Sequence, residues 1–310
     1  MDRSEAVSVV ESGGVQPRDD TGPRGTARPL GITEDSRGII DPARMQQWVT
    51  LHRYPPGPEL SGVIECFCAV SYRVPPGRVH TQQLITHPAV NLSVAHGQVQ
   101  ADARPRPLEA TVTGVGRRLY ARRIAGTGWG IAAKSTPGGF GAFVPASVAG
   151  LNDRVLPLSD VLALDDAALI AEIASVDEPE GIAILKGHLE KLFSDADPER
   201  RRRAEEVSGV SALARTDRSL RRLDHLAAAA GIGARTLQRL FIEYVGVSPT
   251  WVLRRYRLLE AAETVRDGRP VVWADVAADL GYSDQAHLVR DFRDTVGTTP
   301  AAYAAAQRRS

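Results

Sequence analysis

The stretch LAAAAGI at residues 226–232 recurs in this chain as VAADLGY at residues 276–282. Two further stretches follow each copy at matching positions: LQRLF (237–241) and VGVSP (245–249) after the first copy, LVRDF (288–292) and VGTTP (296–300) after the second. The offset is 50 residues up to the glycine and 51 beyond it, so the second copy has gained one loop residue. A unit of this size that occurs only twice indicates a duplicated motif and excludes a solenoid array or a propeller.

Each copy predicts a helix, a tight turn and a second helix. In the first copy a short apolar helical face stops at Gly231, a residue suited to the positive φ of a helix C-terminus. Gly233 is the expected N-cap of the second helix, whose apolar residues follow i, i+3, i+4, i+7 spacing: Leu237, Leu240, Phe241 and Tyr244. In the second copy Ser283 is the expected N-cap, and Leu288 and Phe292 are expected to be buried. Two helices joined by a short glycine-containing turn form a helix-turn-helix unit, whose second helix can lie in the major groove of DNA.

A long helix is predicted between the two copies. Ser248 and Pro249 begin it, and it runs to about Arg266 with Trp251, Leu258, Leu259, Ala262 and Val265 pointing inward. At 1.5 Å per residue, those ~17 residues span roughly 25 Å. Such a stiff linker can hold two recognition helices about one turn of DNA apart, ~34 Å, so that one monomer reads successive major grooves.

Composition and charge agree with a globular protein of two domains. The 310 residues are 43% hydrophobic and 24% charged, which excludes a disordered, collagen-like or fibrous chain. Of the 38 basic and 37 acidic residues, 18 Arg and 13 Asp or Glu lie in residues 201–310, so that part carries +5 and the remainder −4. A basic C-terminal third is expected when one domain binds a polyanion. Without a signal peptide or a membrane span in the sequence, we expect a cytoplasmic protein with no membrane partner.

Three regions follow from the sequence pattern. Residues 1–44 contain few apolar residues and are predicted to be a disordered tail. Residues 45–195 are predicted to form a β-rich regulatory domain with trailing helices, and residues 196–310 an all-α domain, so the fold class is multidomain α+β. In the all-α domain the first helix-turn-helix unit covers about 223–244, the linker helix about 249–266, and the second unit about 273–296.

Short runs rich in β-branched residues predict a mostly antiparallel barrel or sandwich before residue 134. The predicted strands lie within residues 62–74, 90–95, 111–115, 119–124 and 129–133. After Pro145 the apolar spacing changes to three and four, which predicts helices around residues 158–162, 169–173 and 182–192. Asp197 followed by Pro198 predicts a capped helix start at the domain boundary, and the charged run that follows is expected to be a solvated helix face.

The C-terminal region resembles the AraC/XylS family of bacterial transcriptional regulators. The resemblance covers about Leu223 to Tyr303 and rests on residues 237–241, on residues 246–249 (GVSP), and above all on residues 275–288 (DVAADLGYSDQAHL) with Phe292 and Arg293. In this family the C-terminal domain consists of two helix-turn-helix units joined by a helix, and the N-terminal domain senses an effector, dimerises, or both. One departure is Gly233-Ala234, where the family more often has Ser-Pro, so the helix cap is slightly weaker here.

Exposed positions near the start of each recognition helix are expected to reach base edges. In the first unit these are Ala234, Arg235, Gln238 and Arg239, and the resemblance places the family's base readers on the same face. In the second unit Gln285, Ala286, His287 and Arg290 occupy the equivalent face, with a phosphate contact as the alternative for His287. Arg pairs bidentately with guanine and Gln with adenine, each worth ~1 to 3 kcal/mol of discrimination.

A second set of residues is predicted to contact phosphate groups. It consists of the linker-helix start and the arginines near the two units: Ser248, Thr250, Arg254, Arg255, Arg257 and Arg293. Solvated surface is the alternative interpretation of these arginines.

The N-terminal region resembles the β-rich regulatory domain of some AraC relatives of actinobacterial type, through residues 51–54 (LHRY), 87–92 (HPAVNL) and 134–140 (KSTPGGF). By analogy a cupin-like effector barrel is expected. His80, His87 and His96 are too scattered for a metal site, so neither a metal nor another cofactor is expected. Cys66 and Cys68 have the spacing of strand neighbours on one face, and they are interpreted as packed thiols in preference to a redox pair.

The predicted function is therefore a sequence-specific regulator of transcription that binds double-stranded DNA and is not an enzyme. An alkylation-repair-like enzyme targeted to DNA is the alternative, although two cysteines cannot supply a four-cysteine metal site. A degenerate unit that binds only protein is a third interpretation, and steep salt dependence of binding would distinguish DNA recognition from it. Three further candidate partners are RNA polymerase, a small-molecule effector and a second copy of the chain.

Overall fold

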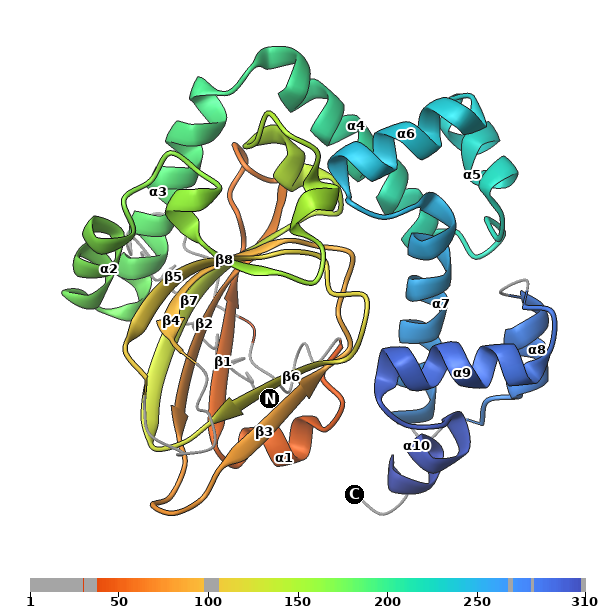
Figure 1. Ribbon diagram of the computed structural model, residues 1–310, viewed down its shortest axis with the longest axis horizontal. Coiled ribbons are helices and arrows are strands. Elements are labelled where there is room, and N and C mark those ends of the chain that lie inside the picture. Colours follow the sequence, from red (N-terminus) through yellow and green to blue (C-terminus); the bar gives the residue numbers. More distant parts are fainter. Residues whose placement is uncertain (1–29, 31–37, 98–105, 267–269, 280–281, 308–310) are drawn as a thin grey trace, which may run out of the picture.

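The computed structural model describes residue 30 and residues 38–97, 106–266, 270–279 and 282–307. Within them the N-terminal half is a β domain with helices on one side, and the C-terminal half is entirely helical (Figure 1). The strands are β1 (Val49–Tyr54), β2 (Ile64–Arg73), β3 (His80–Leu84), β4 (Asn91–His96), β5 (Leu108–Thr113), β6 (Tyr120–Ile124), β7 (Thr127–Ser135) and β8 (Val155–Pro157).

The strands form two antiparallel sheets. One has the order β1-β2-β7-β4-β5-β8, and the other is the pair β3-β6. In β4 the side chains of Leu92 and Val94 are buried in the main core, as expected for a strand with one face toward a core. The prediction of a mostly antiparallel β domain is confirmed, and each of the five predicted strands corresponds to an observed one. Strands β1, β3 and β8 were not among the predicted runs.

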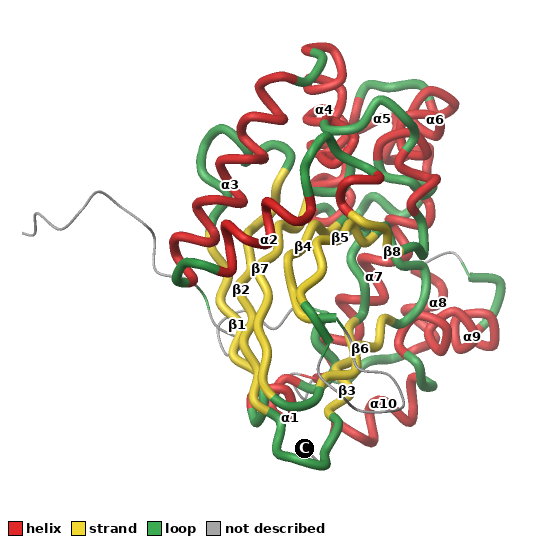
Figure 2. The backbone as a smooth tube through the Cα atoms, turned by 60° about the vertical axis from the view of Figure 1, so that its left-hand side comes forward, coloured by secondary structure: helices red, strands yellow, loops and turns green. Residues whose placement is uncertain are grey.

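Helices cover one side of the larger sheet (Figures 1 and 2). Helix α2 (Asp166–Ala174) packs against β4 and β5, and α3 (Glu178–Asp195) packs against β2 and β7. The helices predicted around residues 169–173 and 182–192 are therefore confirmed. The helix predicted around residues 158–162 is wrong: this segment follows β8 as the 3-10 turn η3 (Leu158–Asp160), which buries Leu158.

The predicted disordered tail needs a correction at its C-terminal end. Residues 1–29 and 31–37 lie outside the described residues. Residues 38–44 are folded: Ile39 is buried and bridges to Leu84, and helix α1 (Pro42–Gln46) begins after its N-cap Asp41. Ile39 completes a small core with residues of later segments, which the sequence of the tail alone does not indicate: Met45, Val49, Leu51, Tyr72, Val74 and Ile124.

The C-terminal half consists of α4 (Pro198–Thr216), α5 (Leu223–Ala230), α6 (Ala234–Tyr244), α7 (Pro249–Arg266), α8 (Trp273–Asp279), α9 (Gln285–Val296) and α10 (Pro300–Gln307). As predicted, Asp197 caps α4, accepting a hydrogen bond from the Arg200 amide at 2.9 Å. Helix α4 packs against both α7 and the 3-10 turn η1 (Gly139–Ala142) of the β domain. A contiguous hydrophobic core thus extends from the sheet into the helical half. None of the helices in the described ranges is long and apolar enough to cross a membrane.

Candidate DNA-binding surface

Helices α5 and α6 form the first helix-turn-helix unit. Helix α5 ends at Gly231, which has φ of +64°, and the amide of Ile232 donates back to the Ala227 carbonyl at 3.0 Å. This positive φ is why glycine suits the position. Gly233 is the N-cap of α6 and offers no side-chain cap, as the sequence predicted. Leu237 and Phe241 are fully buried, so the apolar side of α6 is fixed to the core and its opposite side faces outward.

The predicted base-reading residues of the first unit lie on that outward side. Arg235, Gln238 and Arg239 are all exposed, as is Ala234. Arg239 is 68% exposed at its side chain, and its Nη1 lies 3.4 Å from Glu243 Oε2, one helical turn further along α6. The surface of α6 therefore presents two guanidinium groups and one amide, the side-chain types that recognise base edges in the major groove.

Helices α8 and α9 form the second unit. Leu288 and Phe292 are fully buried, and the ring of Phe292 contacts Trp273 edge-on with centroids 5.0 Å apart. The N-cap of α9 is Asp284, not Ser283 as predicted, because the Asp284 carboxylate accepts the His287 amide at 2.7 Å. That hydrogen bond is the largest cause of the lowered pKa of Asp284. A carboxylate at this position also interacts favourably with the positive end of the helix dipole and so stabilises the helix.

Three of the four predicted base readers of the second unit are exposed on α9: Gln285, Ala286 and Arg290. His287, in contrast, is half-buried, and its ring lies edge-on to Tyr282 with centroids 4.9 Å apart. The Tyr282 hydroxyl donates to Asp291, and burial together with this bond raises the pKa of Tyr282. His287 is thus the least accessible of the four and packs against the turn.

Helix α7 separates the two units. Its 18 residues correspond to about 27 Å at 1.5 Å per residue. Figure 1 shows α6 near one end of α7 and α9 near the other. An ion pair also connects the two units, in addition to α7. Arg221 Nη1 lies 2.8 Å from Asp279 Oδ1 and joins the segment before α5 to α8.

The predicted phosphate contacts lie in different environments. Arg293 is exposed, whereas Ser248 and Thr250 are half-buried at the start of α7. Ser248 Oγ accepts the Trp251 amide at 3.2 Å and so acts as a helix cap. Arg254 is half-buried with its guanidinium over the Tyr282 ring, 5.1 Å from the centroid.

Two of the predicted phosphate contacts are corrected by the structure. Arg255 is 2% exposed and donates to Thr86 and to the Arg117 carbonyl of the β domain, so it is an interdomain residue. Burial lowers the pKa of Arg255 to about 10, and it stays charged at neutral pH. Arg257 has a side chain only 12% exposed, and it donates to Glu260 and to the Asp217 carbonyl.

The cysteines and histidines of the β domain show no arrangement of metal ligands. Cys66 and Cys68 are half-buried on one face of β2, with their Sγ atoms 3.7 Å apart, as their spacing predicted. In the part of the chain that the structure describes, no three His, Cys, Asp or Glu residues are grouped as a metal site would require.

Two residues that contact the predicted base-reading face, Glu243 and Arg200, were not predicted from the sequence. Glu243 pairs with Arg239, and the i, i+4 spacing of the two residues could have indicated that pair. Arg200 of α4 also reaches Glu243, at 3.3 Å. No sequence signal indicates this contact, because it depends on how α4 packs against α6.

Comparison with known proteins gives two family matches. Residues 226–306 match a family described as a helix-turn-helix domain, and residues 52–157 match a domain of unknown function, DUF6597. The probable transcription factor PqrA of Proteus vulgaris is 33% identical over 82 residues, which are 26% of this chain and 66% of that protein. The chain thus matches slightly less than two thirds of that relative's length.

Among solved structures, the DNA-binding domain of AdpA, in complex with a target DNA, is 30% identical, with a TM-score of 0.27 over 34% of this chain and 93% of that one. An apo ToxT variant of Vibrio cholerae is 11% identical, with a TM-score of 0.36 over 77% of this chain and 96% of that one. The helix-turn-helix match begins at Leu226 within α5 and ends in α10, so it covers the second unit and all but the first three residues of the first. The C-terminal region of this chain, residues 226–306, is a helix-turn-helix domain of the AraC/XylS family.

Proposed function

We propose that this protein is a sequence-specific DNA-binding regulator of transcription, and that α6 and α9 read two successive major grooves. The observation that carries the proposal is the matched exposure of the two recognition helices. Each buries its apolar side completely and presents an arginine and a glutamine outward: Arg239 and Gln238 on α6, Arg290 and Gln285 on α9. The family match over residues 226–306 supports the same conclusion.

The β domain is proposed to modulate this activity as a sensor. This proposal is supported by the contacts of the β domain with several different elements of the DNA-binding half. Asn152 Nδ2 donates to the Gly246 carbonyl after α6 at 2.6 Å, and Arg255 of α7 donates to Thr86. The Leu119 amide donates to the Asp294 carbonyl of α9 at 3.2 Å. A change in the β domain therefore has direct routes to both recognition helices, and we propose that the protein acts on cytoplasmic DNA with an effector as a second partner.

Selection of bound sequences from random duplex DNA tests the proposal. We expect the purified full chain to select a motif of roughly 15 to 20 base pairs with two boxes one helical turn apart. Arg239→Ala should blur one box and Arg290→Ala the other. Arg202→Ala is the matched control, since this exposed arginine of α4 pairs with Glu199 on its own helix.

The salt dependence of binding provides an independent measurement. Binding through phosphate contacts should weaken steeply between 50 and 200 mM salt, by roughly 10³-fold or more when about six phosphates are contacted. Failure to select a motif, or a motif unchanged by both arginine substitutions, would contradict the proposal.

A further inference from the structure

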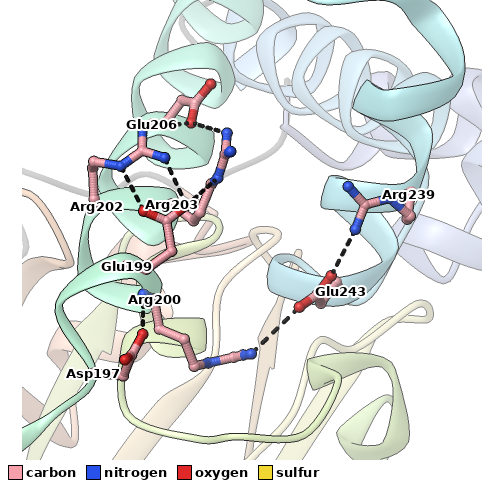
Figure 3. Close-up of polar contacts among 8 residues, drawn as sticks. All are labelled: Asp197, Glu199, Arg200, Arg202, Arg203, Glu206, Arg239 and Glu243. Carbon is pink, nitrogen blue, oxygen red and sulfur yellow. Dashed lines mark hydrogen bonds and ion pairs between the residues drawn. The ribbon is translucent and has the colours of Figure 1, made fainter.

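A single carboxylate bridges two arginines at the base-reading face of α6 (Figure 3). Glu243 Oε1 accepts from Arg200 Nη1 at 3.3 Å, and Glu243 Oε2 accepts from Arg239 Nη1 at 3.4 Å. The three side chains differ in exposure, with Arg200 at 19%, Glu243 at 31% and Arg239 at 68%. The bridge therefore leads from the protein interior to the surface that is proposed to meet DNA.

The inner arginine is anchored on the β domain. Arg200 Nε donates to the Gly141 carbonyl of η1 at 3.1 Å, and its guanidinium lies over the Tyr244 ring, 4.9 Å from the centroid. A Cβ on Gly141 would come within 2.4 Å of Tyr244 Cδ1, so this close approach requires glycine. Arg200 is thus held from three sides, by a backbone carbonyl, an aromatic ring and a carboxylate.

Neighbouring arginines of α4 do not share this arrangement. Arg202 and Arg203 pair with Glu199 and Glu206 on the same helix, and in Figure 3 their dashed lines lead to these two carboxylates and not to Glu243. These pairs stay within α4 and do not connect it to α6. Of these three arginines of α4, Arg200 is the one whose ion pair reaches the recognition helix.

From this geometry we infer that Glu243, held in place by Arg200, is a positioning residue that orients Arg239 for base readout. The inference rests on the proposed function and deepens it, because it makes readout by Arg239 depend on the contact of η1 with α4. A bidentate contact with guanine needs two parallel N–H groups. With Nη1 turned toward Glu243, the edge formed by Nε and Nη2 stays free for such a contact. Fixing a flexible arginine before binding reduces the entropy lost when it meets its base.

The loss of selectivity in Arg239→Ala first identifies the base pair that Arg239 reads. The experiment then measures the affinity of the full chain for its selected site and for the three DNA sites that differ from it at this base pair. The ratio of these affinities is the discrimination at that base pair. We expect Glu243→Gln to reduce discrimination at that base pair by roughly 3- to 10-fold, part of the ~5- to 150-fold that one bidentate contact supplies. Arg200→Lys should act in the same direction and more weakly, since a lysine cannot hold Gly141 and Glu243 at once. Arg202→Lys is the matched control and should change nothing.

A double variant separates positioning from a general effect on folding. In the Arg239→Ala background, Arg200→Lys should leave discrimination at that base pair unchanged, because the residue that it positions is gone. Unchanged discrimination in both single variants, or an equal loss at every base pair of the site, would overturn the inference. Failure of the unmodified protein to select any motif would instead overturn the proposed function, and this inference with it.

Discussion

Arg255 in the middle of α7 donates from Nη1 to both oxygen atoms of Thr86, at 3.1 Å to the carbonyl and 2.8 Å to the hydroxyl. Its Nη2 donates to the Arg117 carbonyl at 2.8 Å, so the helix that joins the two reading units is bound to the β domain. The guanidinium also lies over the Trp251 ring, 4.4 Å from the centroid. No carboxylate hydrogen-bonds to this side chain among the described contacts: oxygens of Thr86 and Arg117 accept from it, and Asp291 acts on its charge from a distance.

Loss of Arg255 should destabilise the contact between the two halves. Arg255→Ala leaves the carbonyl oxygens of Thr86 and Arg117, in part-buried hydrogen bonds, without this donor, and a buried polar group that loses its partner costs about 1 to 3 kcal/mol. We expect the free energy of unfolding in urea to fall by at least about 1 to 3 kcal/mol. Arg293→Ala, at an exposed position, is the control and should stay within about 0.5 kcal/mol of the unmodified protein. Equal stability of the two variants would contradict this role of Arg255.

Substitution of two glycines in the turn of the first unit should change the stability of the protein in opposite directions. Gly231 has φ of +64° with open space around it, so Gly231→Ala adds backbone strain without a clash. Left-handed backbone costs an L-residue about 1 to 2 kcal/mol, and thermal unfolding should occur at a correspondingly lower temperature. Gly233→Ser should instead stabilise by a few tenths of a kcal/mol, since serine supplies the cap that α6 lacks. A gain on Gly231→Ala would show that the turn does not require positive φ.

Acid should loosen the start of α9. The pKa of Asp284 is lowered in the folded protein, chiefly by the hydrogen bond from the His287 amide, so its stabilising contribution is present above the ordinary Asp pKa of about 3.9. This contribution is lost as the pH falls through the lowered folded value. Hydrogen exchange at the His287 amide should accelerate in that range, measured by NMR. Asp284→Asn keeps an acceptor that does not titrate, and its exchange should lack this acid step.

The two cysteines should differ in their reactivity. The hydrogen bond with Cys66 lowers the pKa of Cys68 despite its burial, assisted by the charges of Arg53 and Lys134. The same bond and burial raise the pKa of Cys66. Alkylation by iodoacetamide should therefore begin at Cys68 at lower pH, because the thiolate is the reactive form. Cys66→Ala removes the hydrogen bond and should shift the pH midpoint of Cys68 labelling upward, as peptide mass spectrometry can measure.

The two helix-turn-helix units could be predicted because local pattern decides them. Gly231 and the spacing of Leu237 and Phe241 specify a turn and a buried face regardless of the rest of the chain. The cap of α9 was placed one residue early, at Ser283, since both Ser283 and Asp284 are good capping residues and only the backbone distinguishes them. Strand β3 was missed because its sequence HTQQL is mostly polar, and it forms by pairing with β6.

The environment of Arg255 could not be predicted from its helix alone. Charged residues of a linker helix are normally solvated, and only docking of the β domain buries this one. A signal was nevertheless present. Buried residues on α7 are not confined to one stripe, since Val252, Leu253 and Tyr256 are buried together with Leu258 and Leu259. A helix that is apolar on several sides lies between layers of the protein.

Three of the contacts of the β domain with the DNA-binding half occur at Gly246 after α6, at Arg255 within α7, and at Asp294 in α9. The β domain thus contacts the DNA-binding half next to both helix-turn-helix units and along the helix that joins them. If the two units read DNA as proposed, we expect the distance between the half-sites that they accept to depend on these contacts as well as on the linker helix. We therefore expect variation in the β domain to change operator spacing without any change in the residues proposed to contact bases.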